Sequence, residues 1–282
     1  MPSTVDPIKI ADLLREQTAL HILPRFRQLA AHEIMSKTSP TDLVTVADQE
    51  MERALIKILP DFLSGSIVLG EEGVSSGLIS LDALKDTSRP IWVTDPVDGT
   101  YNFAHGKEEF CTMLTLLIEG RTVMSWIYDP IKNRMMIAER GSGARLNDQE
   151  IVIRQPGKPL HALDGFAGLK YFRKEMRPHI EAQSAKVAKL HSLFCAGHEY
   201  LRLATGHADF SIYTKVMPWD HLAGQLMFEE AGGYLRQWDG SPYTAQTKFG
   251  GILAAADLQQ WSDLRALFLD KIIEDYARSR QL

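Results

Sequence analysis

The sequence predicts an α+β fold in which strands lie in layers between helices. Three observations lead to this prediction. The N-terminal part carries apolar residues at helical intervals, residues 112–148 are rich in β-forming residues interrupted by turn residues, and helical segments alternate with short strands after about residue 150. A chain of 282 residues forms either one large unit or two lobes. We expect an N-terminal α+β lobe over residues 1–150 and a C-terminal α/β lobe over residues 151–282.

The first forty residues have a helical apolar pattern that Pro24 should interrupt, and a turn is expected at residues 36–40. A capping sequence from Thr45 to Asp48 then predicts the start of a second helix, with Met51, Leu55 and other apolar residues on one side. Residues 66–69 and 91–94 are short apolar runs that end at Gly70 and Asp95. We expect these to be buried strands that deliver acidic residues at their C-terminal ends.

Turn residues at 119–120, 129–130 and 141–143 divide the β-rich segment into antiparallel strands. Farther along, helices are expected at residues 198–205, 220–230 and 258–277, and strands at 234–237 and 252–255. The Gly232-Gly233 pair is a typical end for the second of these helices. Trp92 and Trp126 are interpreted as core residues.

The composition argues against several classes of protein. A net charge of −5 disfavours a nucleic-acid or anionic-membrane surface, and no run of eighteen apolar residues is present. The first residues lack the basic-then-apolar pattern of a signal peptide. The two cysteines, Cys111 and Cys195, have neither zinc-ligand spacing nor a disulfide framework. We therefore expect a reduced, cytoplasmic protein.

Acidic residues recur where the chain should change direction. Asp95 and Asp98 flank Pro96 and Val97, so both carboxylates and the Val97 carbonyl can converge on one point before a turn at Gly99. Oxygen ligands of this kind suit a hard cation such as Mg²⁺. Residues 101–103 form a plausible short helix, and the N–H groups at its start would receive a phosphate. The other acidic positions are Glu71, Glu72, Asp220 and Asp48, the last with Lys37 nearby.

Each of these features has an ordinary structural alternative. The Asp-Gly-Thr sequence at Asp98 is typical of a simple turn, and Glu71 with Glu72 is typical of a solvated pair. Asp220 could serve only as a helix N-cap, and Asp48 as a charge in a first helical turn. Lys37 could be a solvated loop residue.

Taken together, the segments resemble the inositol monophosphatase family. Residues 92–103 (WVTDPVDGTYNF) are similar to its first signature, and residues 218–224 (PWDHLAG) with 229–233 (EEAGG) are similar to its second. Residues 70–72 (GEE) and 37–48 (KTSPTDLVTVAD) follow the family's order and spacing. The resemblance implies a layered α/β/α/β/α sandwich, usually a homodimer, and a metal-dependent phosphomonoesterase.

The resemblance also assigns roles to residues. Glu71, Asp95 and the Val97 carbonyl would hold one Mg²⁺, Asp95, Asp98 and Asp220 a second, and a third ion would lean on Glu71; Mn²⁺ stays open as an alternative. Asp48 and Thr100, assisted by Glu71, would orient and deprotonate the attacking water. The backbone at Gly99 and Thr100 would hold the phosphate. The first lobe thus carries most of the metal ligands, and the second contributes Asp220 and substrate contacts.

Substrate contacts are expected at Asp98, Ala196 and Tyr213. Inositol-specific members of the family carry a glutamate at the position of Tyr213, so the substrate is an inositol-monophosphate-like metabolite or, alternatively, histidinol phosphate, fructose 1,6-bisphosphate or a nucleoside 3',5'-bisphosphate. His198 and Glu199 are either new substrate contacts or helix residues that face solvent or a partner subunit. The histidines at positions 105, 191, 207 and 221 are interpreted as surface or packing residues.

Two rival functions remain at this point. Haloacid-dehalogenase-like phosphatases attack phosphorus with an aspartate, but they separate two aspartates by one residue, whereas two residues separate Asp95 from Asp98. A non-catalytic module that binds sugar phosphates is the other rival. It would not need Glu71, Asp48 and Thr100 beside the metal ligands. Neither nucleic acid nor a membrane is expected as a partner.

Overall fold

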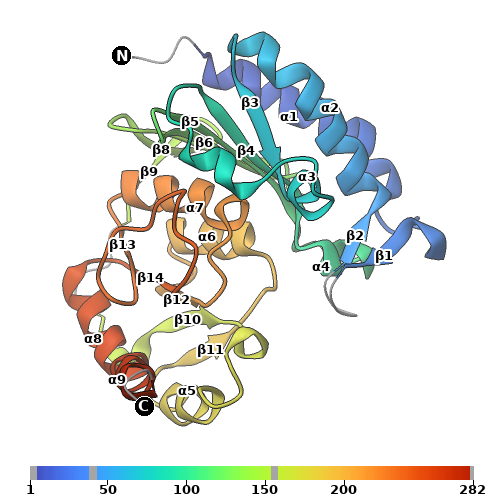
Figure 1. Ribbon diagram of the computed structural model, residues 1–282. Coiled ribbons are helices and arrows are strands. Elements are labelled where there is room, and N and C mark those ends of the chain that lie inside the picture. Colours follow the sequence, from blue (N-terminus) through green and yellow to red (C-terminus); the bar gives the residue numbers. More distant parts are fainter. Residues whose placement is uncertain (1–4, 38–42, 154–157, 280–282) are drawn as a thin grey trace.

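The computed structural model describes residues 5–37, 43–153 and 158–279, and the chain forms alternating layers of helices and sheets (Figure 1). The α-helices are α1 (Pro7–His21), α2 (Val46–Phe62), α3 (Glu71–Ser75), α4 (Thr100–Ala104), α5 (Arg177–Ser184), α6 (Ala196–Ala204), α7 (Pro218–Glu230), α8 (Leu258–Phe268) and α9 (Asp270–Ser279). The strands are β1 (Ile34–Ser36), β2 (Leu43–Thr45), β3 (Ile67–Gly70), β4 (Ile91–Asp98), β5 (Cys111–Ile118), β6 (Arg121–Asp129), β7 (Arg134–Glu139), β8 (Gly143–Leu146), β9 (Gln149–Ile151), β10 (Asp164–Ala167), β11 (Lys189–His191), β12 (Phe210–Tyr213), β13 (Tyr234–Gln237) and β14 (Ile252–Ala255).

Two large sheets separate three helical layers (Figure 1). The seven-stranded sheet runs from β3 to β9 in sequence order, with only the β3–β4 pair parallel. The five-stranded sheet has the order β11-β10-β12-β14-β13. Helices α1 and α2 cover the outer face of the first sheet, α6 and α7 lie between the sheets, and α5, α8 and α9 lie beyond the second. The predicted five-layer α+β sandwich is confirmed.

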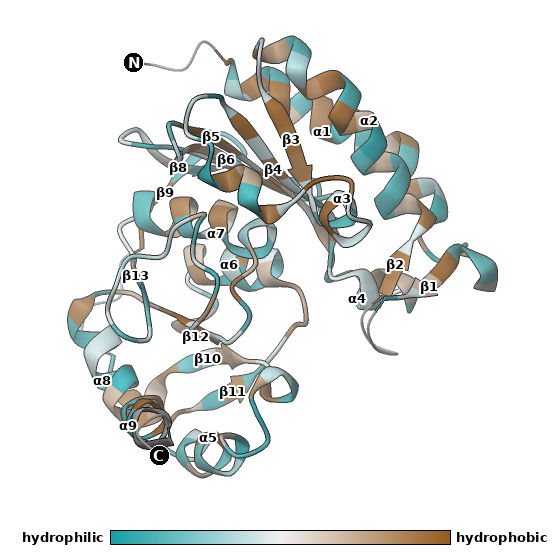
Figure 2. Cartoon of the chain, in the orientation of Figure 1, coloured by the Kyte–Doolittle hydropathy of each residue, from teal (hydrophilic) through white to brown (hydrophobic). Residues whose placement is uncertain are grey.

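Strands of the seven-stranded sheet are apolar on both faces because both faces are covered. Trp92 and Trp126 point toward α1 and α2, where their rings lie 6.1 Å apart. Val93 and Ile127, one residue farther along each strand, join the cluster on the opposite face. Figure 2 shows β3 in hydrophobic colours, whereas α1 and α2 carry both colours, as surface helices do. The interpretation of the tryptophans as core is confirmed.

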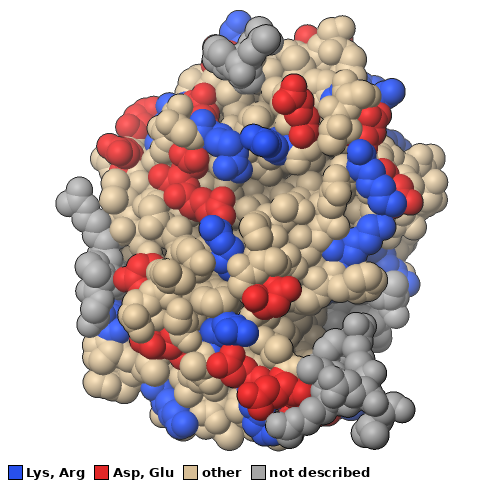
Figure 3. Space-filling model, turned by 60° about the vertical axis from the view of Figure 1, so that its left-hand side comes forward, with Lys and Arg blue, Asp and Glu red and all other residues tan. Residues whose placement is uncertain are grey.

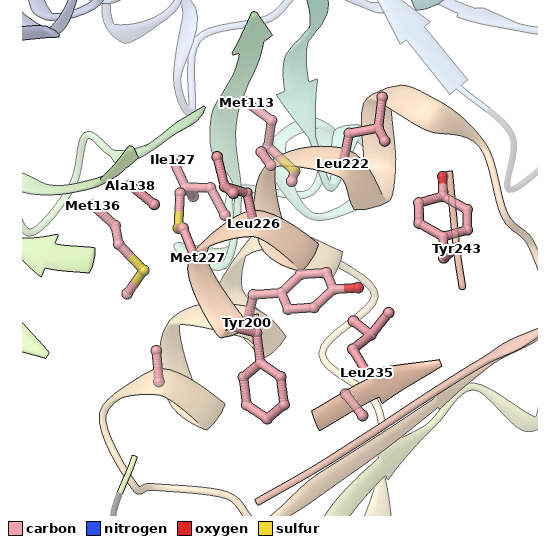
Figure 4. Packing of buried hydrophobic residues seen from close by; sticks show 14 of the residues in the cluster. Met113, Ile127, Met136, Ala138, Tyr200, Leu222, Leu226, Met227, Leu235 and Tyr243 are labelled. Carbon is pink, nitrogen blue, oxygen red and sulfur yellow. The ribbon is translucent and has the colours of Figure 1, made fainter. Parts of the chain in front are cut away.

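Helix α7 is the centre of the middle layer. Leu222, Leu226 and Met227 pack between Met113 and Met136 of the first sheet and Leu235 of the second (Figure 4). The helix is buried nearly all round. It ends as predicted, since Gly232 adopts φ 92° and the Gly233 N–H donates to the Phe228 carbonyl at 2.8 Å.

The N-terminal expectation is partly wrong. Helix α1 ends at His21, and Pro24 lies in a short 3₁₀ segment, so the interruption at proline is confirmed. The helical pattern beyond it forms no helix, because residues 34–36 form β1 and pair antiparallel with β2. Thr45 and Asp48 form the predicted capping box of α2. Residues 38–42 lie outside the described residues. They include part of the expected turn at 36–40 and part of the family-like segment 37–48.

The C-terminal expectation also needs correction. The strands at 234–237 and 252–255 are confirmed, but the helix predicted over 258–277 is divided between α8 and α9 at Leu269. Phe268 and Leu269 are both fully buried, and a change of direction between two helices lets neighbouring residues enter the same core. Strands β10, β11 and β12 and helix α5 were not predicted. Among the described residues, no helix combines the length and apolar character needed to cross a bilayer.

Candidate active site

The acidic residues meet where β3, β4 and α7 end or begin. Strands β3 and β4 are parallel, with Gly70 beside Thr94, so the next residues, Glu71 and Asp95, emerge at one edge of the sheet. Asp220 is the third residue of α7. Glu71, Asp95 and Asp220 each place a carboxylate oxygen within 4.8 Å of the others. Asp220 is not the N-cap of its helix, because Met217 occupies that position, so the N-cap alternative is wrong.

Burial and mutual repulsion make this cluster electrostatically unfavourable without a cation. The pKa of Asp95 is raised well above its usual value by burial and by the charges of Glu71, Asp98 and Asp220. Burial and the charges of Glu71 and Asp98 likewise raise the pKa of Asp220. The donor set is composed of oxygen atoms, which fits a hard divalent cation.

The end of β4 differs from the prediction in detail. The strand does not stop at Asp95 but continues to Asp98, with an irregular register against β5 between these residues. The Val97 N–H donates to the Asp95 carboxylate at 3.0 Å. Gly99 then adopts φ 87°, and a Cβ there would lie 2.8 Å from the Glu109 carbonyl oxygen. The predicted tight turn at Gly99 is confirmed, and α4 begins directly after it.

Asp98 turns one carboxylate oxygen toward the start of α6. Its Oδ2 accepts the Gly197 N–H at 2.6 Å and lies 3.2 Å from the Cys195 Sγ. Cys111 and Cys195 are free and buried, with their sulfur atoms 3.8 Å apart. Burial raises the pKa of Asp98, while the Gly197 N–H and the Cys195 thiol lower it.

Asp48 and Thr100 lie together beside the carboxylates. The Thr100 hydroxyl is 3.3 Å from the Asp48 Oδ1 and 2.9 Å from the Val97 carbonyl oxygen, and it can donate to either. The second oxygen of Asp48 accepts the backbone N–H of Thr45 at 2.8 Å. Burial raises the pKa of Asp48 to about 7, in the range where a carboxyl group exchanges protons near neutrality.

Glu52 is a site residue that the sequence did not predict. Its carboxylate accepts the N–H groups of Glu72 and Gly73, at 2.9 and 2.6 Å, and so caps the short helix α3 that carries Glu71. A Cβ on Gly70 would meet this carboxylate at 2.2 Å. The signal was weak because Glu52 lies mid-helix, where a glutamate is usually solvent-facing.

Lys37 is not a solvated loop lysine. Its Nζ lies 2.7 Å from Glu71 and 2.6 Å from Glu72. Although burial opposes the charge, the two carboxylates raise the pKa of Lys37 above its usual value. Glu71 and Glu72 are therefore an ion-paired group rather than the solvated pair of the simple alternative.

This arrangement agrees with the comparisons with known proteins. The sequence profile of the inositol monophosphatase family matches residues 6–273 of this chain. The chain belongs to the inositol monophosphatase family. Its assignment as a metal-dependent phosphomonoester hydrolase is confirmed by that membership, which speaks against the haloacid-dehalogenase-like alternative. Relatives named Nus factor SuhB leave the non-catalytic alternative open without favouring it.

Relatives come from distant organisms. Inositol monophosphatase 2 of Saccharomyces cerevisiae is 32% identical over 71% of this chain and 70% of its own length. Inositol-1-monophosphatase of Bacillus subtilis is 29% identical over 75% of this chain and 78% of its own. Nus factor SuhB of Vibrio cholerae is 29% identical over 76% and 78%. An inositol monophosphatase structure from Thermotoga maritima superposes with a TM-score of 0.80 at 24% identity, covering 95% of this chain and 98% of the other.

A pocket beside the carboxylates is lined by the residues that the sequence analysis predicts as substrate contacts. Asp98, Ala196, Tyr213 and Asp220 all line it, together with Glu199. Burial raises the pKa of Glu199 to about 7, while Ser192 and the Leu193 N–H, each 2.9 Å away, donate to its carboxylate. Glu199 therefore faces the pocket rather than solvent or a partner subunit.

The histidines are packing or surface residues, as predicted for most of them. His198 is buried with its Nε2 3.0 Å from the Phe110 carbonyl oxygen, so both earlier interpretations of His198, as a substrate contact and as an outward-facing residue, are wrong. His221 is buried against Tyr213, and burial lowers its pKa to about 3. His105 stacks on Tyr101 at the surface.

Proposed function

We propose that this chain hydrolyses a small phosphate monoester with Mg²⁺ ions held by Glu71, Asp95, the Val97 carbonyl, Asp98 and Asp220. The convergence of Glu71, Asp95 and Asp220 within 4.8 Å carries the proposal. When bound, two or three such ions would neutralise the phosphate and lower the pKa of a coordinated water; Mn²⁺ is the alternative ion.

The paired Asp48 and Thr100 supply proton transfer in this proposal. A deprotonated Asp48 would draw the Thr100 hydroxyl proton toward itself, which frees the hydroxyl oxygen to accept a hydrogen bond from the attacking water. Its raised pKa of about 7 makes Asp48 a suitable proton acceptor near neutral pH. Glu71, on the other side of the cluster, would assist in orienting the water.

The turn at Gly99 would hold the phosphate. Gly99 and Thr100 stand at the start of α4, where backbone N–H groups lack partners within the helix. Because Gly99 has φ 87° and a close neighbour at the Cβ position, no larger residue can present this backbone in the same way. Charge neutralisation and alignment by such groups supply most of the rate in phosphoryl transfer.

Asp98, Ala196 and Tyr213 would contact the alcohol part of the substrate. Relatives named for inositol monophosphate, and a Thermotoga maritima relative named fructose-1,6-bisphosphatase/inositol-1-monophosphatase, support a phosphorylated sugar or polyol. Histidinol phosphate and a nucleoside 3',5'-bisphosphate are alternatives. The face drawn in Figure 3 mixes acidic and basic side chains, which supports a small-molecule partner rather than nucleic acid.

Phosphate release from these esters, with and without magnesium, tests the proposal. The wild-type protein should release phosphate only with a divalent cation. The Asp220→Asn variant should lose roughly 10²-fold or more in kcat, because it removes a charge from the metal site. Asp263→Asn on the exposed face of α8 is the matched control and should keep full activity. Equal rates in all three proteins would refute the assignment.

We also propose that the chain forms a homodimer and acts in the cytoplasm. The free, buried pair of cysteines supports a reducing compartment, and the dimer is the usual assembly of the family. Analytical ultracentrifugation should give twice the mass of one chain; a single-chain mass would contradict the dimer.

A further inference from the structure

Three lysines from separate segments gather around two tyrosine rings beside the substrate pocket, which Lys215 lines. Lys107 follows α4, Lys170 follows β10, and Lys215 lies between β12 and α7. The Nζ atoms of Lys107 and Lys170 lie 5.6 and 5.7 Å from the centre of the Tyr101 ring. Those of Lys170 and Lys215 lie 4.8 and 5.8 Å from the centre of the Tyr171 ring. Two aromatic rings thus bring three like charges together.

Aromatic rings lie beside all three charges, and the charge of Lys215 also acts on the Asp220 carboxylate. None of the three lysines forms an ion pair with a carboxylate in the part of the chain that the structure describes. Lys170 lies 4.3 Å from the centre of a third ring, Phe194. Its pKa is lowered by partial burial and by the charges of Lys215 and Lys107, which is the expected mark of unneutralised repulsion.

The cluster adjoins the proposed site of hydrolysis. Tyr171, Phe194 and Lys215 line the same pocket as Asp98 and Asp220, so one wall is acidic and the other basic. The acidic wall is assigned above to metal ions and the phosphate that is hydrolysed. The positive charge of the basic wall favours an anionic group over an uncharged alcohol. Lysine ammonium groups bind phosphate as point charges.

We propose that Lys170 and Lys215, with Lys107 at the rim, bind a second phosphate of the substrate. The preferred substrate is accordingly a small bisphosphorylated metabolite, of which one phosphate is hydrolysed at the carboxylates and the other stays on the lysines. This inference rests on the proposed function and selects among its alternatives. The rings of Tyr101, Tyr171 and Phe194 hold the ammonium groups in place before the ligand arrives.

Matched pairs of substrates test the inference. Phosphate release is measured for fructose 1,6-bisphosphate against fructose 1-phosphate, and for adenosine 3',5'-bisphosphate against adenosine 3'-phosphate. In at least one pair the wild type should favour the bisphosphate, by about tenfold in kcat/KM. The double variant Lys170→Gln/Lys215→Gln should lose about tenfold on that bisphosphate, chiefly through KM, and change little on its monophosphate. Lys170→Arg/Lys215→Arg should restore most of the loss.

Lys132→Gln, at the exposed turn between β6 and β7, removes one lysine charge away from the pocket and should leave kcat/KM unchanged for both substrates. No preference in either pair, or an equal loss on both members of a pair, would overturn the inference while leaving the proposed function intact. If the wild type hydrolyses none of the esters, the proposed function fails. Calorimetric binding of the same pairs then decides the inference, since the double variant must weaken only the bisphosphate.

Discussion

At the scale of single residues, the Thr100 hydroxyl connects two parts of the site. It lies between the Asp48 carboxylate and the Val97 carbonyl oxygen, at 3.3 and 2.9 Å. A hydroxyl has one proton to donate, so the metal ligand and the proton acceptor compete for it. Loading the Val97 carbonyl with a cation would direct the proton toward Asp48.

The Asp48–Thr100 pair should act as a unit. We expect Thr100→Ala and Asp48→Asn each to lower kcat by about 10²-fold, and the double variant to lose little more than either single one. Thr100→Ser keeps the hydroxyl and should retain most of the activity. The measurement is single-turnover phosphate release in all four proteins. Fully multiplicative losses would show that the two side chains act independently.

At the scale of elements, α3 depends on a residue from another helix. The five-residue helix is too short to order Glu71 alone, and Glu52 of α2 accepts two of its N–H groups. Gly70 permits the close approach of this carboxylate. The position of a metal ligand is therefore fixed by packing between α2 and α3.

Removing this cap should weaken metal binding before it unfolds the protein. In Glu52→Ala the buried N–H of Gly73 and the half-buried N–H of Glu72 lose their acceptor, and a buried N–H without a partner costs about 1–3 kcal/mol. We expect a lower melting temperature and a severalfold higher magnesium concentration for half-maximal activity. Glu16→Gln on the exposed side of α1 is the control. An unchanged magnesium requirement would show that α3 holds Glu71 without Glu52.

At the scale of the whole molecule, the buried carboxylates link stability to pH and to metal. Asp48, Asp95, Asp98 and Asp220 all have raised pKa values in the folded protein, chiefly through burial. Without cations, the folded state holds protons that the unfolded chain has released. The free energy of unfolding therefore falls as pH rises from ~4 to about 7, the folded pKa of Asp48.

Thermal unfolding with a chelator and with magnesium checks this sign. The metal-free protein should melt at a lower temperature at about pH 8 than at about pH 5. Magnesium should raise the melting temperature, and by more at the higher pH, because cations and protons compete for the same oxygens. In Asp220→Asn the magnesium effect should shrink. A magnesium effect that is equal at both pH values would contradict the coupling.

The long elements and the acidic motifs were predictable because their signals are local. Capping at Thr45, the β-forming runs divided by turn residues in β5 to β7, and the turn at Gly99 all depend on a few neighbouring residues. The family-like segments predicted the cluster of Glu71, Asp95 and Asp220. Strands β10 to β12, three or four residues long, were missed. Strands β13 and β14 are equally short, but each follows a pair of glycines, a boundary signal that β10 to β12 lack. The division into lobes at about residue 150 stays a prediction.

What the amino-acid order established is which oxygen-bearing side chains stand at the ends of strands, and hence the class of chemistry. Contacts between distant segments decided the rest: that Glu52 caps α3, that His198 turns inward to a carbonyl while Glu199 faces the pocket, and that three lysines share two rings. A local pattern records only how a segment folds. Which side chains from separate segments meet depends on how the layers pack. The burial and the electrostatic environment of a side chain are set by all the segments that surround it in the folded chain.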